Sequence, residues 1–135
     1  MQHIFYLECD ESNGWMEFNT GCYKCFTDPK SWYSAGKDCE ANAGFLTSVH
    51  SQEEQTFIES LCGDLDSTHD IWFGLYKEQD VFKYADGTEV DYQNWGNGFP
   101  KFSQSWVLMA NDESYKWHDQ ASLHVDGIFV CRQEL

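Results

Sequence analysis

Basic residues are scarce in this sequence, where eight Lys and Arg stand against 23 Asp and Glu. The formal charge of −15 at pH 7 repels phosphate backbones and anionic membrane surfaces, so nucleic acid is not an expected partner. The acidic residues are scattered through the chain rather than clustered in runs. This distribution favours a solubilising surface over a cation-binding cluster.

Long apolar runs are also absent, because no segment approaches the roughly 18 consecutive apolar residues that a membrane span needs. We therefore expect no membrane insertion. Residues 1–8 have neither a cationic start nor an apolar run long enough for a signal peptide, and we treat them as an N-terminal extension. The length of 135 residues suits a single domain over residues 9–135.

Catalytic motifs are missing as well. The pairs His69-Asp70 and His118-Asp119 do not make a triad, and the sequence has neither a nucleophile elbow nor the His-Glu spacing of a zinc protease. The segment nearest to a calcium loop, residues 64–70, lacks the glycine at the sixth position and the glutamate at the twelfth. We therefore expect a protein without enzymatic activity and without a cofactor.

Cysteine and aromatic residues are what the sequence has in quantity. Aromatic residues make up 17% of the chain, which suits a compact domain with one core. An even number of cysteines without zinc-like spacing predicts disulfides and an extracellular, secreted protein, although six cysteines allow 15 pairings. The six are Cys9, Cys22, Cys25, Cys39, Cys62 and Cys131.

The apolar spacing predicts two helices followed by several short strands. Trp32, Ala35 and Cys39 recur at helical spacing after Ser31, and Gly44 is expected to end that helix. A capping box at Ser51 begins a second helix that closes at Cys62-Gly63. Hairpin turns are expected at Asn13-Gly14 and Asp86-Gly87. Strands are expected near residues 23–26, 71–76, 81–85, 106–109, 115–117 and 127–131, which together give an α+β fold with a mixed or antiparallel sheet.

The stretch from Trp95 to Asp119 is expected to carry the function. Glycines, a proline and aromatic residues make it too irregular for one helix or strand, which is typical of a presented binding loop.

Taken in order, these features resemble the C-type lectin-like domain family from Cys9 to Leu135. The resemblance implies that fold, with two helices, small antiparallel or mixed sheets and a long irregular loop region. It also implies the disulfides Cys9–Cys22 and Cys39–Cys131, and leaves Cys25 and Cys62 either bridged or as buried thiols. The marks are Cys9, Gly14-Trp15, Cys22-Tyr23, Trp32, Ala35, Cys39, Leu46, Ser48, residues 51–57, Trp72-Phe73-Gly74-Leu75, Asp86-Gly87, Trp95, Trp117-His118-Asp119 and Phe129-Val130-Cys131.

The chain departs from the family pattern in the loop region. The bridge that should join a cysteine near Ser105 or Trp106 to one near Ser122 or Leu123 is missing, and we expect burial of Trp106 to hold the loop instead.

The calcium motif of the family's sugar-binding members is also degraded. Phe99 and Lys101 flank Pro100 where that motif has oxygen ligands, and the ammonium of Lys101 offers no lone pair. Farther on, Gln104 or Ser105 falls where a further acid would be, and His118 stands in the place of an asparagine. We expect no metal; if calcium binds after all, its ligands would be Asn111, Asp112, Glu113 and Asp119. One hypothesis is that the Lys101 ammonium pairs with Asp119 and replaces the ion.

The predicted ligand site combines aromatic and polar side chains. His118 is expected to be exposed, whereas the resemblance implies that Trp95 and Trp117 pack in the core below the loop. The candidate ligand-binding residues are Phe99, Lys101, Phe102, Gln104, His118 and Asp119.

The predicted function is calcium-free recognition of an extracellular protein or glycan by a monomer or homodimer. A protein is slightly favoured, because an aromatic surface of mixed charge suits protein contacts. The alternatives are a carbohydrate-binding lectin, with or without calcium, and a structural protein associated with mineral or ice.

Overall fold

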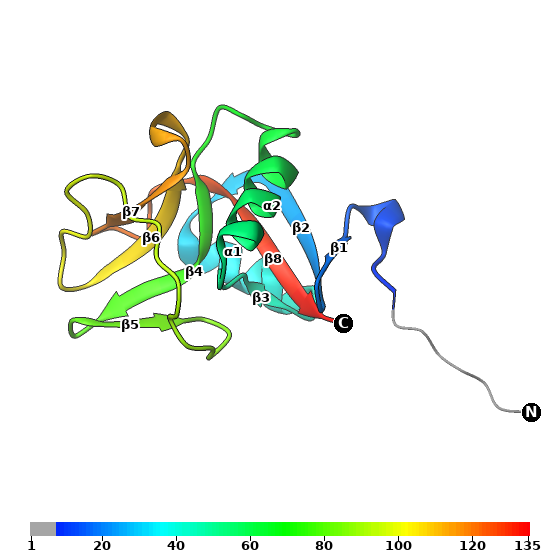
Figure 1. The fold of residues 1–135 in the computed structure, drawn as a ribbon, viewed down its shortest axis with the longest axis horizontal. Helices are drawn as coiled ribbons and strands as arrows, with labels where there is room; N and C mark the ends of the chain where they lie inside the picture. Colours follow the sequence, from blue (N-terminus) through cyan, green and yellow to red (C-terminus); the bar gives the residue numbers. More distant parts are fainter. Residues whose placement is uncertain (1–7) are drawn as a thin grey trace, which may run out of the picture.

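The computed structural model describes residues 8–135 as an α+β fold in which two helices flank one mixed sheet (Figure 1). This confirms the predicted fold class. Within that range no helix is both long and apolar enough to cross a membrane. The helices are α1 (Trp32–Ala41), α2 (Gln52–Gly63) and the short 3-10 helices η1 (Glu11–Asn13) and η2 (Asn111–Glu113). The strands are β1 (Met16–Phe18), β2 (Gly21–Lys30), β3 (Phe45–Leu46), β4 (Ile71–Glu78), β5 (Val81–Tyr84), β6 (Ser105–Ala110), β7 (Lys116–Gln120) and β8 (Gly127–Glu134).

The sheet brings the two ends of the chain together. Its order is β1-β2-β8-β4-β6-β7, with β3 added to β8 and β5 added to β4. All pairs are antiparallel except β4 and β8, which run parallel with Ile71 opposite Ile128. Because β2 pairs with β8, the first long strand lies beside the last one. The loop region projects from the other side of β4 (Figure 1).

The second helix begins at the serine of the predicted capping box, and the first begins directly after Ser31, from which the helical spacing runs. The Ser31 side chain accepts a hydrogen bond from the Ser34 amide at 3.3 Å, and Ser51 accepts one from the Glu54 amide at 3.1 Å. The second half of the capping box differs from the expected one. The Glu54 carboxylate accepts the amide of His50 at 2.6 Å, one residue before the N-cap.

Two glycines allow close backbone approaches. Gly44, which was expected to end the first helix, does not do so by adopting a left-handed φ. α1 ends at Ala41, and Ala43 is the residue with left-handed φ. A Cβ on Gly44 would lie 2.5 Å from the Arg132 carbonyl oxygen. On β4, a Cβ on Gly74 would lie 2.4 Å from the Leu46 carbonyl oxygen, as expected for a glycine inside a buried strand.

Both predicted hairpin turns are wrong. Gly14 ends η1 with φ of 90°, and the chain reverses between β1 and β2 at Asn19-Thr20. The β4–β5 hairpin turns at Gln79-Asp80, where both residues have positive φ, while Asp86-Gly87 forms a turn after β5. Gln-Asp is not a usual pair in a two-residue hairpin turn. The sequence pattern therefore favoured Asp86-Gly87 as the turn instead of Gln79-Asp80.

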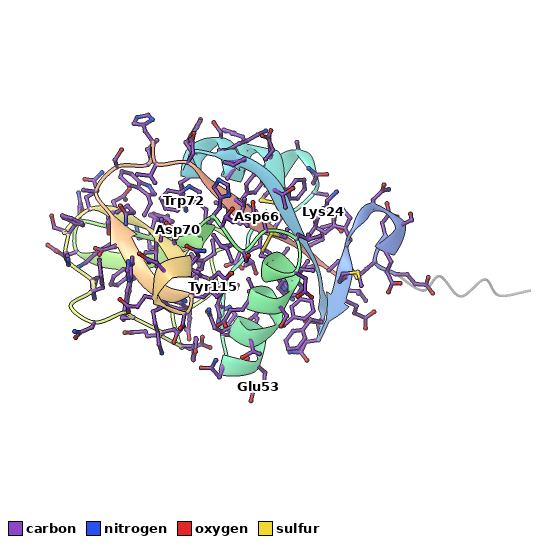
Figure 2. All side chains as sticks on the ribbon, turned by 90° about the horizontal axis from the view of Figure 1, so that it is seen from above. Lys24, Glu53, Asp66, Asp70, Trp72 and Tyr115 are labelled. Atoms are coloured by element: carbon purple, nitrogen blue, oxygen red, sulfur yellow. A yellow bond between two sulfur atoms is a disulfide. The ribbon has the colours of Figure 1, made fainter. Side chains whose placement is uncertain are left out.

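All six cysteines are bridged. Cys9–Cys22 closes the N-terminal hairpin, and Cys39–Cys131 joins α1 to β8, the two pairings that the resemblance implies. The question left open by the sequence is answered by Cys25–Cys62, which joins β2 to the end of α2 with 5.4 Å between Cα atoms. Figure 2 shows sulfur–sulfur bonds beside α2 and in the hairpin.

The sheet is buried on both faces by two apolar clusters. The cluster on the α2 side includes Ile58, Phe73 and Trp117. The cluster on the α1 side includes Ala35, Trp72 and Phe129, and Figure 2 shows Trp72 within the body of the molecule. Trp106 packs against this second cluster and is partly buried, which agrees with its expected role of holding the loop region by packing.

Candidate functional site

The irregular part of the Trp95–Asp119 stretch is shorter than the sequence suggested. Residues 96–104 form a loop that is exposed except at the buried Gly96 and the partly buried Phe99, whereas β6, η2 and β7 take up most of the remainder. The loop lies at the end of the molecule away from the N-terminal hairpin and close to the β4–β5 hairpin (Figure 1). The Asp80 amide donates to the Ser103 carbonyl at 3.1 Å, which ties the two segments together.

Two tryptophans form the floor below this loop. Trp117 is fully buried, and its Nε1 donates to Gln55 Oε1 at 2.9 Å. Trp95 is partly buried and meets Trp117 edge to face, with 5.6 Å between ring centroids. The Gly96 amide donates to the Trp117 carbonyl at 2.9 Å. This hydrogen bond joins the start of the loop to β7. The assignment of both tryptophans to core packing is confirmed, fully for Trp117 and partly for Trp95.

Asp119 binds the loop through main-chain amides. Its carboxylate is 1% exposed and accepts the Lys101 amide at 2.9 and 3.0 Å and the Phe102 amide at 2.9 Å. Two backbone N–H groups of the loop therefore satisfy the oxygens of a buried carboxyl group. The hypothesis of an ion pair between the Lys101 ammonium and Asp119 is wrong, because Lys101 reaches the carboxylate with its backbone.

Glu113 makes a second brace from the other side. Its carboxylate accepts the Asn97 amide at 3.2 Å and lies 3.1 Å from His118 Nε2. A Cβ on Gly96 would lie 2.4 Å from Glu113 Oε2, so the loop passes close to this carboxylate. The His118 side chain is only 16% exposed, which contradicts its expected exposure. It is covered by Phe99, whose ring stacks on it with centroids 3.9 Å apart.

The loop's upper surface carries the remaining predicted side chains. The Lys101 ammonium lies 4.3 Å from the Phe99 ring centroid, so Phe99 has a cation on one side and His118 stacked against it. Phe102 is 39% exposed, and Gln104 is exposed at the point where the loop enters β6. Four predicted residues thus form one cluster, Phe99, Lys101, His118 and Asp119, while Phe102 and Gln104 present their side chains to solvent beside it.

The residues named for a calcium ion do not fit one. Asn111 donates to the Ser67 carbonyl, Asp112 is exposed, and Glu113 is engaged by Asn97 and His118. Asp119 already accepts two amides, and residues 8–135 contain no group of three or more His, Cys, Asp or Glu placed to hold a metal. A hard cation needs six to eight convergent oxygens, which this arrangement does not offer.

Residues 64–70 are likewise built for turn structure. Asp66 accepts hydrogen bonds from the amide and hydroxyl of Thr68 and contacts His69, and Asp70 accepts the Asn111 amide at 2.9 Å. The Thr68 hydrogen bonds, together with His69, lower the pKa of Asp66 to about 2.

Sequence reasoning missed two parts of the site. Glu113 entered only as an alternative calcium ligand, and its role in holding the loop depends on a contact across η2 that no local pattern signals. The β4–β5 hairpin was not connected with the loop at all. The ring centroid of its Phe82 lies 5.2 Å from that of Trp95, and the Lys77 ammonium lies 5.0 Å from the same Phe82 centroid. Two adjacent apolar residues in β5, Val81 and Phe82, point to opposite faces of the strand and are a signal that could have suggested this face.

Comparisons with known proteins agree with this geometry. The family described as Lectin C-type domain matches residues 28–133. Among relatives, one chain of the snaclec coagulation factor IX/factor X-binding protein of Echis carinatus is 29% identical over 127 residues, covering 91% of this chain and 97% of that one. Snaclec 3 of Sistrurus catenatus edwardsii is 32% identical over 131 residues, covering 91% and 84%.

Solved structures with the same fold include a calcium-independent type II antifreeze protein and human lithostathine. The first superposes with a TM-score of 0.82 at 25% identity, covering 98% of each chain. The second superposes with a TM-score of 0.84 at 27% identity, covering 95% of this chain and 92% of the other.

Proposed function

The chain belongs to the C-type lectin domain family, whose members related to it are non-enzymatic binding proteins, and from this premise we propose that it is an extracellular recognition domain that binds a protein ligand through loop 96–104 without calcium. Three disulfides suit an oxidising, extracellular setting.

One observation carries the proposal: the two carboxylates nearest the loop hold its backbone rather than a cation. Asp119 accepts two loop amides and Glu113 accepts a third. This bracing fixes the loop without metal and supports a ligand surface that is formed before binding, which lowers the entropy cost of association. The exposed Phe102 and the Lys101–Phe99 pair then supply an apolar anchor and a charge.

A protein ligand is favoured over a glycan for two reasons. The oxygen ligands through which calcium would hold sugar hydroxyls are absent from the loop, and the carboxylates of Asp119 and Glu113 are engaged by its amides. In addition, one relative is named for binding coagulation factors IX and X, which are proteins.

The test is site-directed photo-crosslinking in chelator. A photoreactive phenylalanine analogue at Phe102 should yield a crosslinked protein from extracellular fluid, whereas the same group at Met16, exposed on the opposite end of the sheet, should not. A glycan array run in the same chelator separates the rival ligand class. Specific array binding that Phe102→Ala removes, without a protein crosslink, would refute the protein-ligand proposal.

A further inference from the structure

The loop lies in the longest part of the sequence without an acidic residue. Residues 92–111 contain no Asp or Glu and one basic residue, Lys101, in a chain with 23 acids. The acidic surface elsewhere repels a negatively charged partner, because like charges brought together in an interface cost free energy. The loop itself therefore adds no negative charge to this acidic surface and contributes one positive charge, that of Lys101.

The carboxylates around the loop already have hydrogen-bond or ion-pair partners. Asp119 is buried and holds two loop amides, and Glu113 holds Asn97 and contacts His118. On the neighbouring hairpin, the Asp80 carboxylate lies 3.8 Å from the Lys77 ammonium. None of these carboxylates neutralises Lys101.

The ammonium of Lys101 lies over an aromatic ring and has no ionic partner among residues 8–135. It lies over the Phe99 ring, which is itself held against His118, and no carboxylate in residues 8–135 comes within ion-pair distance of it. By contrast, Lys30, Lys37, Lys77, Lys83 and Arg132 each pair with an acid. The exposed ring of Phe102 follows directly in the chain, so a cation and an apolar surface are presented together.

We propose that loop 96–104 recognises a segment of its protein ligand in which an isolated Asp or Glu carboxylate pairs with the Lys101 ammonium while an adjacent apolar side chain packs on Phe102. This inference rests on the proposed function and adds the chemistry of the ligand. A single cation beside a phenyl ring suits an isolated carboxylate next to an apolar group. A polyanionic glycan needs several cations and is repelled by a net charge of −15.

The experiment is selection from a phage-displayed library of random 12-residue peptides on the immobilised full chain at fixed salt. Wild type should enrich peptides that carry Asp or Glu beside an apolar residue. Lys101→Glu should instead enrich Lys or Arg at that position. Lys24→Glu is the matched control, because Lys24 also lies over a phenylalanine ring without an acidic partner among the described residues, at 4.8 Å from the Phe26 centroid. It should keep the wild-type preference.

Affinity and location are then measured with one selected peptide by ¹⁵N NMR titration. Lys101→Gln should weaken binding by about three- to fivefold, replacing Glu by Gln in the peptide should do the same, and Lys24→Gln should change it less than about twofold. The peptide should shift the amides of residues 97–104.

The outcomes separate the two proposals. Peptides that shift the loop amides but show no acidic preference overturn the carboxylate inference and leave the loop as the ligand site. Peptides that shift only amides elsewhere, or no enrichment at all, count against the proposed function as well. Binding of a sulfated or sialylated oligosaccharide that Lys101→Gln removes would assign the cation to a glycan and overturn the inference.

Discussion

The imidazole of His118 lies nearly parallel to the ring of Phe99, with centroids 3.9 Å apart and planes 11° from each other. This contact joins the side chain of an exposed loop to strand β7, whose neighbouring residue Trp117 is at the centre of the core. The loop is thereby linked to a fully buried part of the domain, where local opening costs most.

Replacing Phe99 by Ala should loosen the loop with little effect on the fold. The stacking and the Lys101 contact are lost, so we expect a loss of about 0.5–1.5 kcal/mol in unfolding free energy. Hydrogen exchange of amides 97–104 should become faster while that of β7 is unchanged. Phe45→Ala, which removes a ring 45% exposed on β3, is the control and should leave loop exchange as it is. Unchanged loop exchange in Phe99→Ala would contradict the stacking role.

Replacing Asp119 by Asn should destabilise the domain. The amide has one acceptor oxygen where the carboxylate has two, and its NH₂ group faces the donors of Lys101 and Phe102. A loss of about 1–3 kcal/mol is expected from urea unfolding, because a backbone N–H donor in this part-buried contact is left unpaired. Asp112→Asn, at an exposed position nearby, should be neutral within about 0.5 kcal/mol.

Calcium should not stabilise the wild type. With its carboxylate oxygens engaged by amides, Asp119 has no convergent partners for a cation, and millimolar calcium should leave the melting temperature unchanged. A calcium-dependent rise in melting temperature that Asp119→Asn removes would show that the loop is braced by an ion after all.

Replacing Gly74 by Ala should severely impair folding. The new Cβ would meet the carbonyl oxygens of Leu46 and Thr47 at 2.4 and 3.0 Å, and the Gly74 amide already donates to Thr47. A loss of about 3 kcal/mol or more is expected by urea unfolding. The matched control is Gly36→Ala within α1, where the nearest atom is a flexible Leu46 methyl at 3.8 Å. Helix propensity predicts that this variant gains up to about 1 kcal/mol. Equal stability of the two variants would refute the argument.

Asp66 should make stability depend on pH in acid. Its folded pKa of about 2 lies below the ordinary value, so the folded state binds fewer protons than the unfolded state in this range. The stabilisation is present above about pH 4 and is lost as the pH falls towards 2. In Asp66→Asn the fall in unfolding free energy between pH 5 and pH 2 should be smaller than in wild type. Asp64→Asn, an exposed neighbour, should retain the wild-type fall.

Local signals in the sequence were sufficient for the framework. Ser31 and Ser51 begin the helices because a side-chain oxygen can satisfy a first-turn amide wherever the chain turns into a helix. The glycine of β4 signalled a close approach because no other residue fits there. The hairpin turns were misplaced because the β4–β5 turn uses Gln79-Asp80, whose positive φ values are imposed by strand pairing and not by local preference.

By itself, the sequence determined the fold class, the helix starts, the buried tryptophans and the loss of oxygen ligands at Phe99, Lys101 and His118. The fold class and the helix starts follow from side-chain chemistry and short-range spacing, whereas the buried tryptophans and the lost oxygen ligands are what the resemblance to the C-type lectin-like family implied. Only the tertiary structure decided that Cys25 bridges Cys62, that Glu113 and Asp119 hold the loop by its amides, and that Phe99 covers His118. Such contacts depend on which segments the sheet brings together. These contacts join residues far apart in the chain, and no local pattern in a single sequence predicts which of them will meet.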